Sequence, residues 1–495
     1  MANILDLPAE VLFKIFLHES LSRSDIARVA RICEMTNAIV TADLYRHIEF
    51  PPYRALASIP QPSMEEVEAR FSRFNFALTS LLSTLATRED LANMVTTLRL
   101  EVNLASPYLN TCSLMETQTN FTELTFGPRA LTASEVVQGL RNLKSLELNN
   151  FWSKTLLRSS FFMPSLETAV VRRNYGDVKT IFQLMVQPNI QEVTIEPSSR
   201  FILMPPSAIP TSIVSHLKLV TPWGGTIELR TLVQMTKNLK SLKLVRTLEQ
   251  CWAPIVAGQQ GCRCGTTAPG PSSEDISDVL SLVTHSLEVL VMTNSHKFPP
   301  PVLESSRLSS LNDFKTLKEL KIGAAMILGT RACPAVHTED PPEDITLPCR
   351  RFADQLPPNL QKLHLEIARE QLDRDERYCE DIIDSMVNNK KQLPELTSLI
   401  VQEVQPLYTS ACRCEGPAFC YNARDEVNSS SPAKAILDLQ QKCSKVGTEL
   451  TYISQRGLAP ACARTLFIAG KEPQALSVAD YHTITTPWTD IDLKL

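Results

Sequence analysis

The sequence predicts an α/β fold in which short parallel strands line the concave face of a curved array and helices lie outside. Two observations support this prediction. An apolar pattern of the form L-x-x-L-x-L recurs along the chain, and segments with apolar residues three or four positions apart, typical of helices, lie between its copies. A strand, a helix and a parallel strand make a right-handed crossover, so repeated units place their strands on one side.

The apolar pattern is clearest in four copies, and weaker copies fill the gaps between them. The clear copies begin at Leu143, Leu239, Leu317 and Leu360, and the weaker ones at Val95, Phe121, Leu166, Ile190, Val214, Leu287 and Leu396. From Phe121 to Leu239 successive copies are 22, 23, 24, 24 and 25 residues apart. Leucine-rich repeats have periods of about 20–29 residues, and the chain therefore resembles that family.

Helices are predicted between the strands, where apolar residues form a single stripe. The expected helices span Ala133–Arg141, Asp177–Gln187, Leu229–Lys237, Asp275–His285 and Arg374–Asn389. The alternative is a doubly wound α/β enzyme, which also alternates strands and helices. No glycine-rich nucleotide motif follows a strand here, and a polar residue interrupts most strands, which indicates one solvated face.

The residue between the last two apolar positions of each copy is expected to face away from the core. These candidate contacts for a protein substrate are Arg99, Thr125, Glu147, Val170, Thr194, Lys218, Lys243, Val291, Lys321 and His364. Lys218, Lys243 and Lys321 would form a basic ridge suited to an acidic partner segment. Ordinary solvated lysine on an open sheet face is the alternative.

The first 50 residues do not follow the repeat. Helices are expected at Leu7–Phe16, Ser24–Cys33 and Ala38–His47, with Pro8 at the first helical position of the first one. Three short helices are too small to be stable alone, which indicates either a docking module or a cap on the array. The run L-P-x-E-V-L-x-x-I-F, then S-D-I-x-x-V-x-x-x-C, then L-Y-R-H-I resembles the F-box, especially its fungal variants.

The F-box resemblance implies docking onto the Skp adaptor and, through it, onto the cullin scaffold of a ubiquitin ligase. The positions that match the adaptor-binding pattern are Leu7, Pro8, Val11, Leu12, Ile15, Phe16, Ile26, Val29 and Cys33. The resemblance implies a substrate-recognition subunit that is not itself an enzyme. The alternative is a leucine-rich-repeat scaffold with no ligase role.

The predicted organisation has four parts. Residues 1–50 form the F-box, residues 51–94 a linker with helices at Glu65–Ala77 and Leu78–Val95, residues 95–470 the array, and residues 471–495 a tail. Insertions are expected near 251–273, 329–358 and 405–432. Further strands near Glu449–Ile453 and Thr465–Ile468, and a helix near Ala433–Lys445, are candidates for the last units.

Composition excludes several function classes. The chain has 495 residues, a net charge of -5 and only 6% aromatic residues, so no basic face for nucleic acid is expected. No run of about 18 apolar residues suggests a membrane span, and the first residues lack the features of a signal peptide. We expect a cytoplasmic or nuclear protein without a cofactor.

Six of the 13 cysteines lie in two inserted segments. Cys262 and Cys264 follow Cys251, and Cys412, Cys414 and Cys420 form the second group. Their C-x-C spacing is tighter than the usual zinc pattern, so free thiols are expected and no metal is predicted, with a structural zinc as the alternative.

Overall fold

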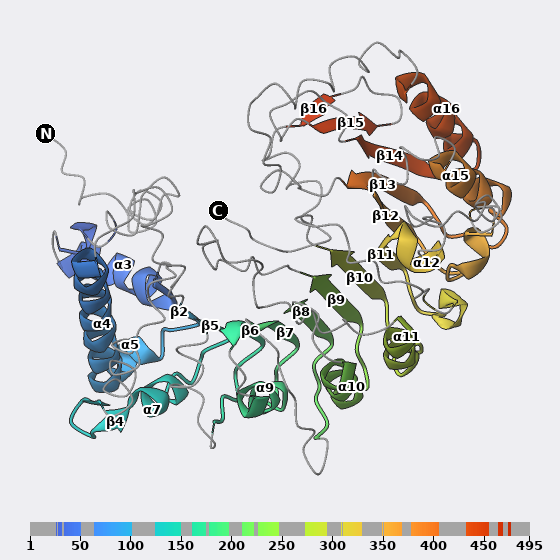
Figure 1. Ribbon diagram of the computed structural model, residues 1–495. Coiled ribbons are helices and arrows are strands. Elements are labelled where there is room, and N and C mark those ends of the chain that lie inside the picture. The colour runs from blue at the N-terminus through green and yellow to red at the C-terminus, as the bar shows by residue number, and fades with distance from the viewer. Residues whose placement is uncertain are drawn as a thin grey trace, which may run out of the picture. The chain divides into compact units, whose positions relative to one another are not determined.

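A computed structural model describes residues 26, 28–31, 34–50, 64–100, 124–149, 161–174, 178–197, 210–221, 226–246, 273–294, 308, 310–328, 349, 351–368, 378–404, 432–454, 464–468 and 474–476. These residues form two compact units, the first ending with residues 210–214 and the second beginning at residue 215. Parallel strands alternate with helices in both units, so the predicted α/β class is confirmed (Figure 1).

The first unit contains a parallel sheet with the strand order β1, β2, β5, β6, β7. These strands are β1 (His47–Phe50), β2 (Thr97–Leu100), β5 (Ser145–Asn149), β6 (Thr168–Asn174) and β7 (Glu192–Pro197). Its helices are α3 (Glu34–Arg46), α4 (Met64–Thr87), α5 (Glu89–Ala92), α7 (Ala133–Gln138) and α9 (Val178–Met185). The predicted break at Ala77 is wrong, because α4 continues to Thr87 where no glycine or proline interrupts it.

The core of the first unit is built from the repeated aliphatic positions. Leu98 lies opposite Leu146, which lies opposite Ala169, and this row ends at Val193. All of these side chains are buried. Because each strand places its apolar residues in register with the next, neighbouring strands share one apolar layer, and each fully buried aliphatic side chain contributes about 1.5–3 kcal/mol.

The copy that begins at Phe121 does not supply a strand to this sheet. Strand β3 (Thr125–Phe126) pairs antiparallel with β4 (Leu131–Thr132) in a separate two-stranded ribbon. The turn between them is tight: Gly127 has a φ of +69°, and a Cβ there would lie 3.0 Å from the Cβ of Ala86. The chain reverses at this glycine, so the sheet passes directly from β2 to β5.

The second unit continues the same construction. Its strands are β8 (His216–Thr221), β9 (Ser241–Arg246), β10 (Val289–Asn294), β11 (Glu319–Gly323), β12 (Lys362–Ala368), β13 (Ser398–Val404), β14 (Glu449–Ser454), β15 (Arg464–Ile468) and β16 (Gln474–Leu476). Its helices are α10 (Thr226–Met235), α11 (Ser273–Ser281), α12 (Ala324–Leu328), α15 (Tyr378–Asn388) and α16 (Pro432–Lys445), with 3₁₀ turns η4 (Leu311–Asp313) and η6 (Ala353–Gln355). Figure 1 shows these helices along one side of the strands.

Strands β8 to β14 run parallel, and their leucines form one continuous row. The row consists of Leu217, Leu242, Leu290, Leu320, Leu363, Leu399 and Leu450, each opposite the next across the sheet. All seven are buried. Strand β15 then pairs antiparallel with β14, and β16 with β15, so the segment expected to form a last parallel unit ends the parallel run instead.

Within the described ranges, no helix combines the length and the apolar content needed to cross a lipid bilayer.

Candidate interaction surfaces

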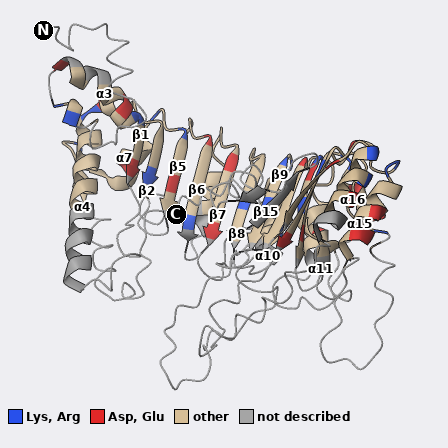
Figure 2. Ribbon diagram, turned by 90° about the horizontal axis from the view of Figure 1, so that it is seen from above, with Lys and Arg blue, Asp and Glu red and all other residues tan. Residues whose placement is uncertain are grey.

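The sheet of the first unit carries a row of alternating charges on the face opposite its aliphatic core. Arg99 Nε lies 3.3 Å from Glu147 Oε2, and Arg172 Nε donates a hydrogen bond of 2.7 Å to Glu147 Oε1. Arg172 Nη1 lies 3.8 Å from Glu196 Oε2. Figure 2 shows the basic and acidic residues of these strands side by side. We call these four residues the charge row.

The strand register explains why the charge row forms. Arg99 and Glu147 are opposite each other, and Val170 and Thr194 continue their line across β6 and β7. Arg172 and Glu196 are paired two residues further along, and residues two apart on a strand face the same side. The sequence pattern identified the line of Arg99, Glu147, Val170 and Thr194. It missed Arg172 and Glu196, although continuing the alternation by two residues along β6 and β7 would have identified them.

The charge row is half-buried and internally matched. Its side chains are between 16% and 31% exposed, and two arginines face two glutamates. Each carboxylate is therefore already close to a guanidinium, and the pairs fix the strands relative to one another. The row remains accessible enough for a partner to contact it, but it offers no net charge to attract one.

The second unit does not present the open basic ridge that the sequence suggested. Val291, His364 and the two lysines Lys218 and Lys321 are buried; of these outward positions in the second unit, Lys243 has intermediate exposure. The sequence pattern places these residues correctly on the face opposite the leucine row. The side chains of Val291, Lys321 and His364 are buried on that face, and their role as partner contacts stays a prediction.

A compact polar cluster occupies this covered face. Lys321 lies opposite His364, and Glu366 lies opposite Gln402. Lys321 Nζ is 3.3 Å from Glu366 Oε1, and His364 Nε2 is 2.8 Å from Gln402 Oε1. Gly323 is the residue opposite Glu366 on β11. Buried charges are tolerated when they are paired in this way, so the cluster joins β11, β12 and β13.

Thr125, another expected substrate contact, is exposed but lies on the two-stranded ribbon and not on the parallel sheet. It therefore shares no face with the charge row, because β3 is not a neighbour of β2 or β5.

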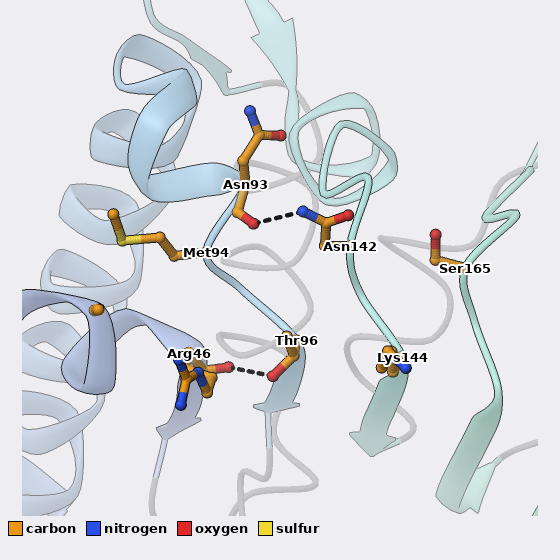
Figure 3. Close-up of a pocket in the computed structure, with 8 residues that line it drawn as sticks. Arg46, Asn93, Met94, Thr96, Asn142, Lys144 and Ser165 are labelled. Carbon is orange, nitrogen blue, oxygen red and sulfur yellow. Dashed lines mark hydrogen bonds between the residues drawn. The ribbon is translucent and has the colours of Figure 1, made fainter.

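A small cleft lies where α3 meets the beginnings of the strands (Figure 3). Its volume is about 360 Å³. Thr96 Oγ1 donates to the carbonyl oxygen of Arg46 at 3.0 Å, and Asn142 Nδ2 donates to that of Asn93 at 2.8 Å. The residues that line the cleft are Ala42, Arg46, Asn93, Met94, Thr96, Asn142, Lys144 and Ser165. The first bond fastens the end of α3 to the start of β2, and the second joins the end of α5 to the turn before β5.

A larger groove lies in the second unit, along the edge at which its strands begin. Its volume is about 750 Å³, and every residue that lines it has a polar or charged side chain. Its lining residues are Asn238, Lys240, His285, Ser286, Glu288, Lys315, Thr316, Lys318, Asn359, Gln361 and Glu395. We call it the edge groove. The sequence pattern did not identify this groove. Its residues lie in the turns before the strands, whereas the pattern considered only the outward-facing positions within the strands.

The adaptor-binding positions expected from the F-box pattern are described in part. Ile26 is buried against Val40, and Val29, Ala30 and Leu44 pack partly buried around them. The remaining positions, Leu7, Pro8, Val11, Leu12, Ile15, Phe16 and Cys33, lie outside the described residues.

Three cysteines among the described residues are buried and form no disulfide: Cys349, Cys379 and Cys443. The two cysteine groups of the inserted segments lie outside the described residues. In the part of the chain that the structure describes, no cluster of His, Cys, Asp and Glu has the arrangement of a metal site.

Burial raises the pKa of the Cys443 thiol from 9.0 to about 11. Since the thiolate is the reactive form, the thiolate fraction at neutral pH falls roughly 100-fold. We expect iodoacetamide to label Cys443 at least about 100-fold more slowly in the folded protein than in urea, measured by peptide mass spectrometry. Equal labelling rates in both conditions would contradict this burial.

Comparison of the chain with protein-family models finds no match, and comparison with curated proteins finds none either.

Proposed function

We propose that this protein is a substrate-recognition subunit of a Skp–cullin–F-box ubiquitin ligase. The observation on which the proposal rests is the sequence pattern of residues 7–47, where the apolar, proline and cysteine positions of the F-box occur in order. The chain would dock on the adaptor through these residues and bind a target protein with its sheet. Partner subunits would catalyse ubiquitin transfer.

The attachment of α3 supports a docking role for the N-terminal segment. Helix α3 continues directly into β1, and β1 pairs with β2 along its length. The amide nitrogen of Thr96 also donates to the carbonyl oxygen of Arg46 at 2.9 Å. Ile26 and Val29, two of the proposed docking positions, pack with Val40 and Leu44 of α3. An adaptor bound at these positions would therefore be held in a fixed position relative to the sheet of the first unit.

Target binding is proposed for the half-exposed face of the first unit. The charge row lies there together with Val170 and Thr194, which have intermediate exposure. Such a mixture of charged, polar and apolar groups is typical of protein–protein interfaces. Because the charges of the row are matched, specificity would come from their fixed positions and not from net attraction.

The adaptor-docking step is tested with a double variant, Leu12→Asp with Ile15→Asp. Two carboxylates on the apolar face of the predicted first helix are expected to abolish co-purification with the Skp adaptor, because charged groups buried without partners cost several kcal/mol. Lys14→Asp is the matched control: it introduces the same total change of charge in the same helix, but at a position outside the apolar stripe, and should leave co-purification unchanged.

Failure of the wild-type chain to co-purify with the adaptor would end the ligase proposal. If target proteins were still captured in that case, the chain would be a repeat scaffold whose N-terminal helices cap the array. If Lys14→Asp weakened adaptor binding as much as the double variant, the apolar stripe would not be the docking face.

A further inference from the structure

We infer that the edge groove of the second unit binds an acidic segment of a partner protein, with Lys240 and Lys315 as its anion-binding side chains. This inference goes beyond adaptor docking and identifies a recognition surface separate from the charge row. It also places the acidic partner at a different location from the ridge of Lys218, Lys243 and Lys321, which the structure shows to be largely covered.

The charges that line the edge groove do not cancel. Glu288 is already paired, because Lys318 Nζ donates to its Oε2 at 2.7 Å. Glu395 lies within electrostatic range of Lys390, whose pKa it raises against the effect of burial. Among the described residues, no carboxylate lies within salt-bridge distance of the Lys240 or Lys315 ammonium groups, and both residues are exposed. These two cations remain for a ligand.

Lysine side chains along the groove stabilise the negative charge of Glu288. The pKa of Glu288 is held below its usual range by the hydrogen bond from Lys318, and then by the charges of Lys318, Lys240 and His216. The negative charge of Glu288 is thus matched chiefly by Lys318. Further carboxylates or phosphates from a partner would be attracted by Lys240 and Lys315.

The groove is held rigid by the backbone. The amide of Glu288 donates to the carbonyl oxygen of Lys240 at 2.8 Å, and the amide of Lys318 donates to that of Glu288 at 2.8 Å. Successive strands lie about 4.8 Å apart, so the backbones of Lys240 and Lys318, two strands apart, are separated by roughly 10 Å. A rigid groove binds an extended segment without the cost of ordering a loop.

Polar side chains fix the floor of the groove as well. Ser286 Oγ donates to the carbonyl oxygen of Leu239 at 3.0 Å, Thr316 Oγ1 to that of Leu287 at 2.9 Å, and Asn359 Nδ2 to that of Lys315 at 2.6 Å. Each residue directly precedes the first leucine of its copy of the apolar pattern, which lies two residues before the strand begins. Each turn is therefore bonded to the preceding one, and the turn that carries Lys315 is fixed by the hydrogen bond from Asn359.

The groove favours a peptide over a nucleic acid. No Phe, Tyr or Trp belongs to its lining residues, and single-stranded nucleic acids depend on aromatic side chains for base stacking. Lysine ammonium groups with asparagine and glutamine amides suit carboxylates and phosphates presented by an extended chain.

The test measures fluorescence polarisation of a short fluorescein-labelled peptide of alternating glutamate and glycine with the full-length chain. Lys240→Gln with Lys315→Gln is expected to weaken binding about tenfold at low ionic strength, because each exposed ion pair contributes modestly. The matched control, Arg230→Gln with Lys445→Gln, removes two exposed cations from α10 and α16. It should bind like the wild type.

Further probes separate the sources of negative charge. A peptide with phosphoserine in place of glutamate distinguishes phosphate from carboxylate recognition, and either one binding supports the inference. A neutral peptide of glutamine and glycine should not bind. No binding by the wild type, equal loss in both double variants, or tighter binding of labelled oligothymidylate than of either acidic peptide would overturn it. The Leu12→Asp, Ile15→Asp variant should bind the peptide normally, so failure here is distinguishable from failure of adaptor docking.

Discussion

Replacement of Lys321 by methionine is expected to lower the free energy of unfolding by about 3–5 kcal/mol. The Lys321 side chain is only 3% exposed and that of Glu366 only 7%, and their charged atoms are 3.3 Å apart. Methionine fills similar space but leaves the Glu366 carboxylate buried without its cation. Urea unfolding of the full-length chain, followed by far-UV circular dichroism, measures the loss.

An exposed lysine on the neighbouring strand is the control. Lys362 pairs with Glu319 at 2.8 Å, but the two side chains are 49% and 31% exposed. Lys362→Met should therefore cost less than about 1 kcal/mol. The double variant Lys321→Met with Glu366→Leu removes both buried charges and should recover most of the stability. A loss in Lys321→Met no larger than that in Lys362→Met would contradict the buried pair.

The buried pair also explains why the sequence misjudged this face. The alternation of apolar and polar residues places Lys321 and His364 on the side opposite the leucine row, and the register confirms this. Alternation reports only which side of the strand a residue faces. It does not report whether that side is covered, which depends on segments distant in sequence. Glu366 is the next outward-facing residue after His364 on β12. Its negative charge could have indicated from the sequence that Lys321 has a buried partner.

Strand positions were predicted well where the aliphatic pattern was complete. The copies that begin at Leu143, Leu239 and Leu360 each precede an observed strand by two residues. Helix α11 also lies within two residues of its expected start at Asp275. These elements follow from local periodicity, because buried positions in strands and helices repeat at fixed intervals.

The sequence analysis missed one short strand and assigned another to the wrong sheet, for different reasons. Residues His47–Phe50 form β1, although the pattern placed His47 at the end of a helix and no complete apolar pattern marks the strand. Its pairing with β2 depends on the contact between Thr96 and Arg46, residues 50 positions apart. Thr125 lies in a segment that has the apolar pattern but turns back at Gly127. Long-range contacts therefore determine the position of β1, and a local turn determines that of β3.

The edge groove lay outside the prediction because its residues come from turns. Each turn contributes one or two polar side chains, and no single turn differs from an ordinary loop. Only the parallel stacking of β9 to β13 brings Lys240, Glu288 and Lys315 into one groove. A sequence pattern restricted to strand positions cannot identify such a surface, since its members share a place in the repeat and not a residue type.

The leucine row makes the stability of the second unit sensitive to a single truncation. Leu363→Ala is expected to lower the free energy of unfolding by about 2–5 kcal/mol. Leu363 is fully buried and lies between Leu320 and Leu399 in the register, so the cavity would remove contacts from both neighbouring strands. Urea unfolding of the full-length chain measures the change.

The matched control removes the same atoms from an exposed leucine. Leu437 lies on α16 and is 45% exposed, so Leu437→Ala should change the free energy of unfolding by about 0.5 kcal/mol or less. The contrast between the two variants tests whether aliphatic layers shared between strands hold the second unit together. Equal effects would show that the row in register contributes no more than a surface leucine. A large effect of Leu363→Ala alone means that each strand depends on its neighbours, because its apolar side chains are buried only when both flanking strands are in place.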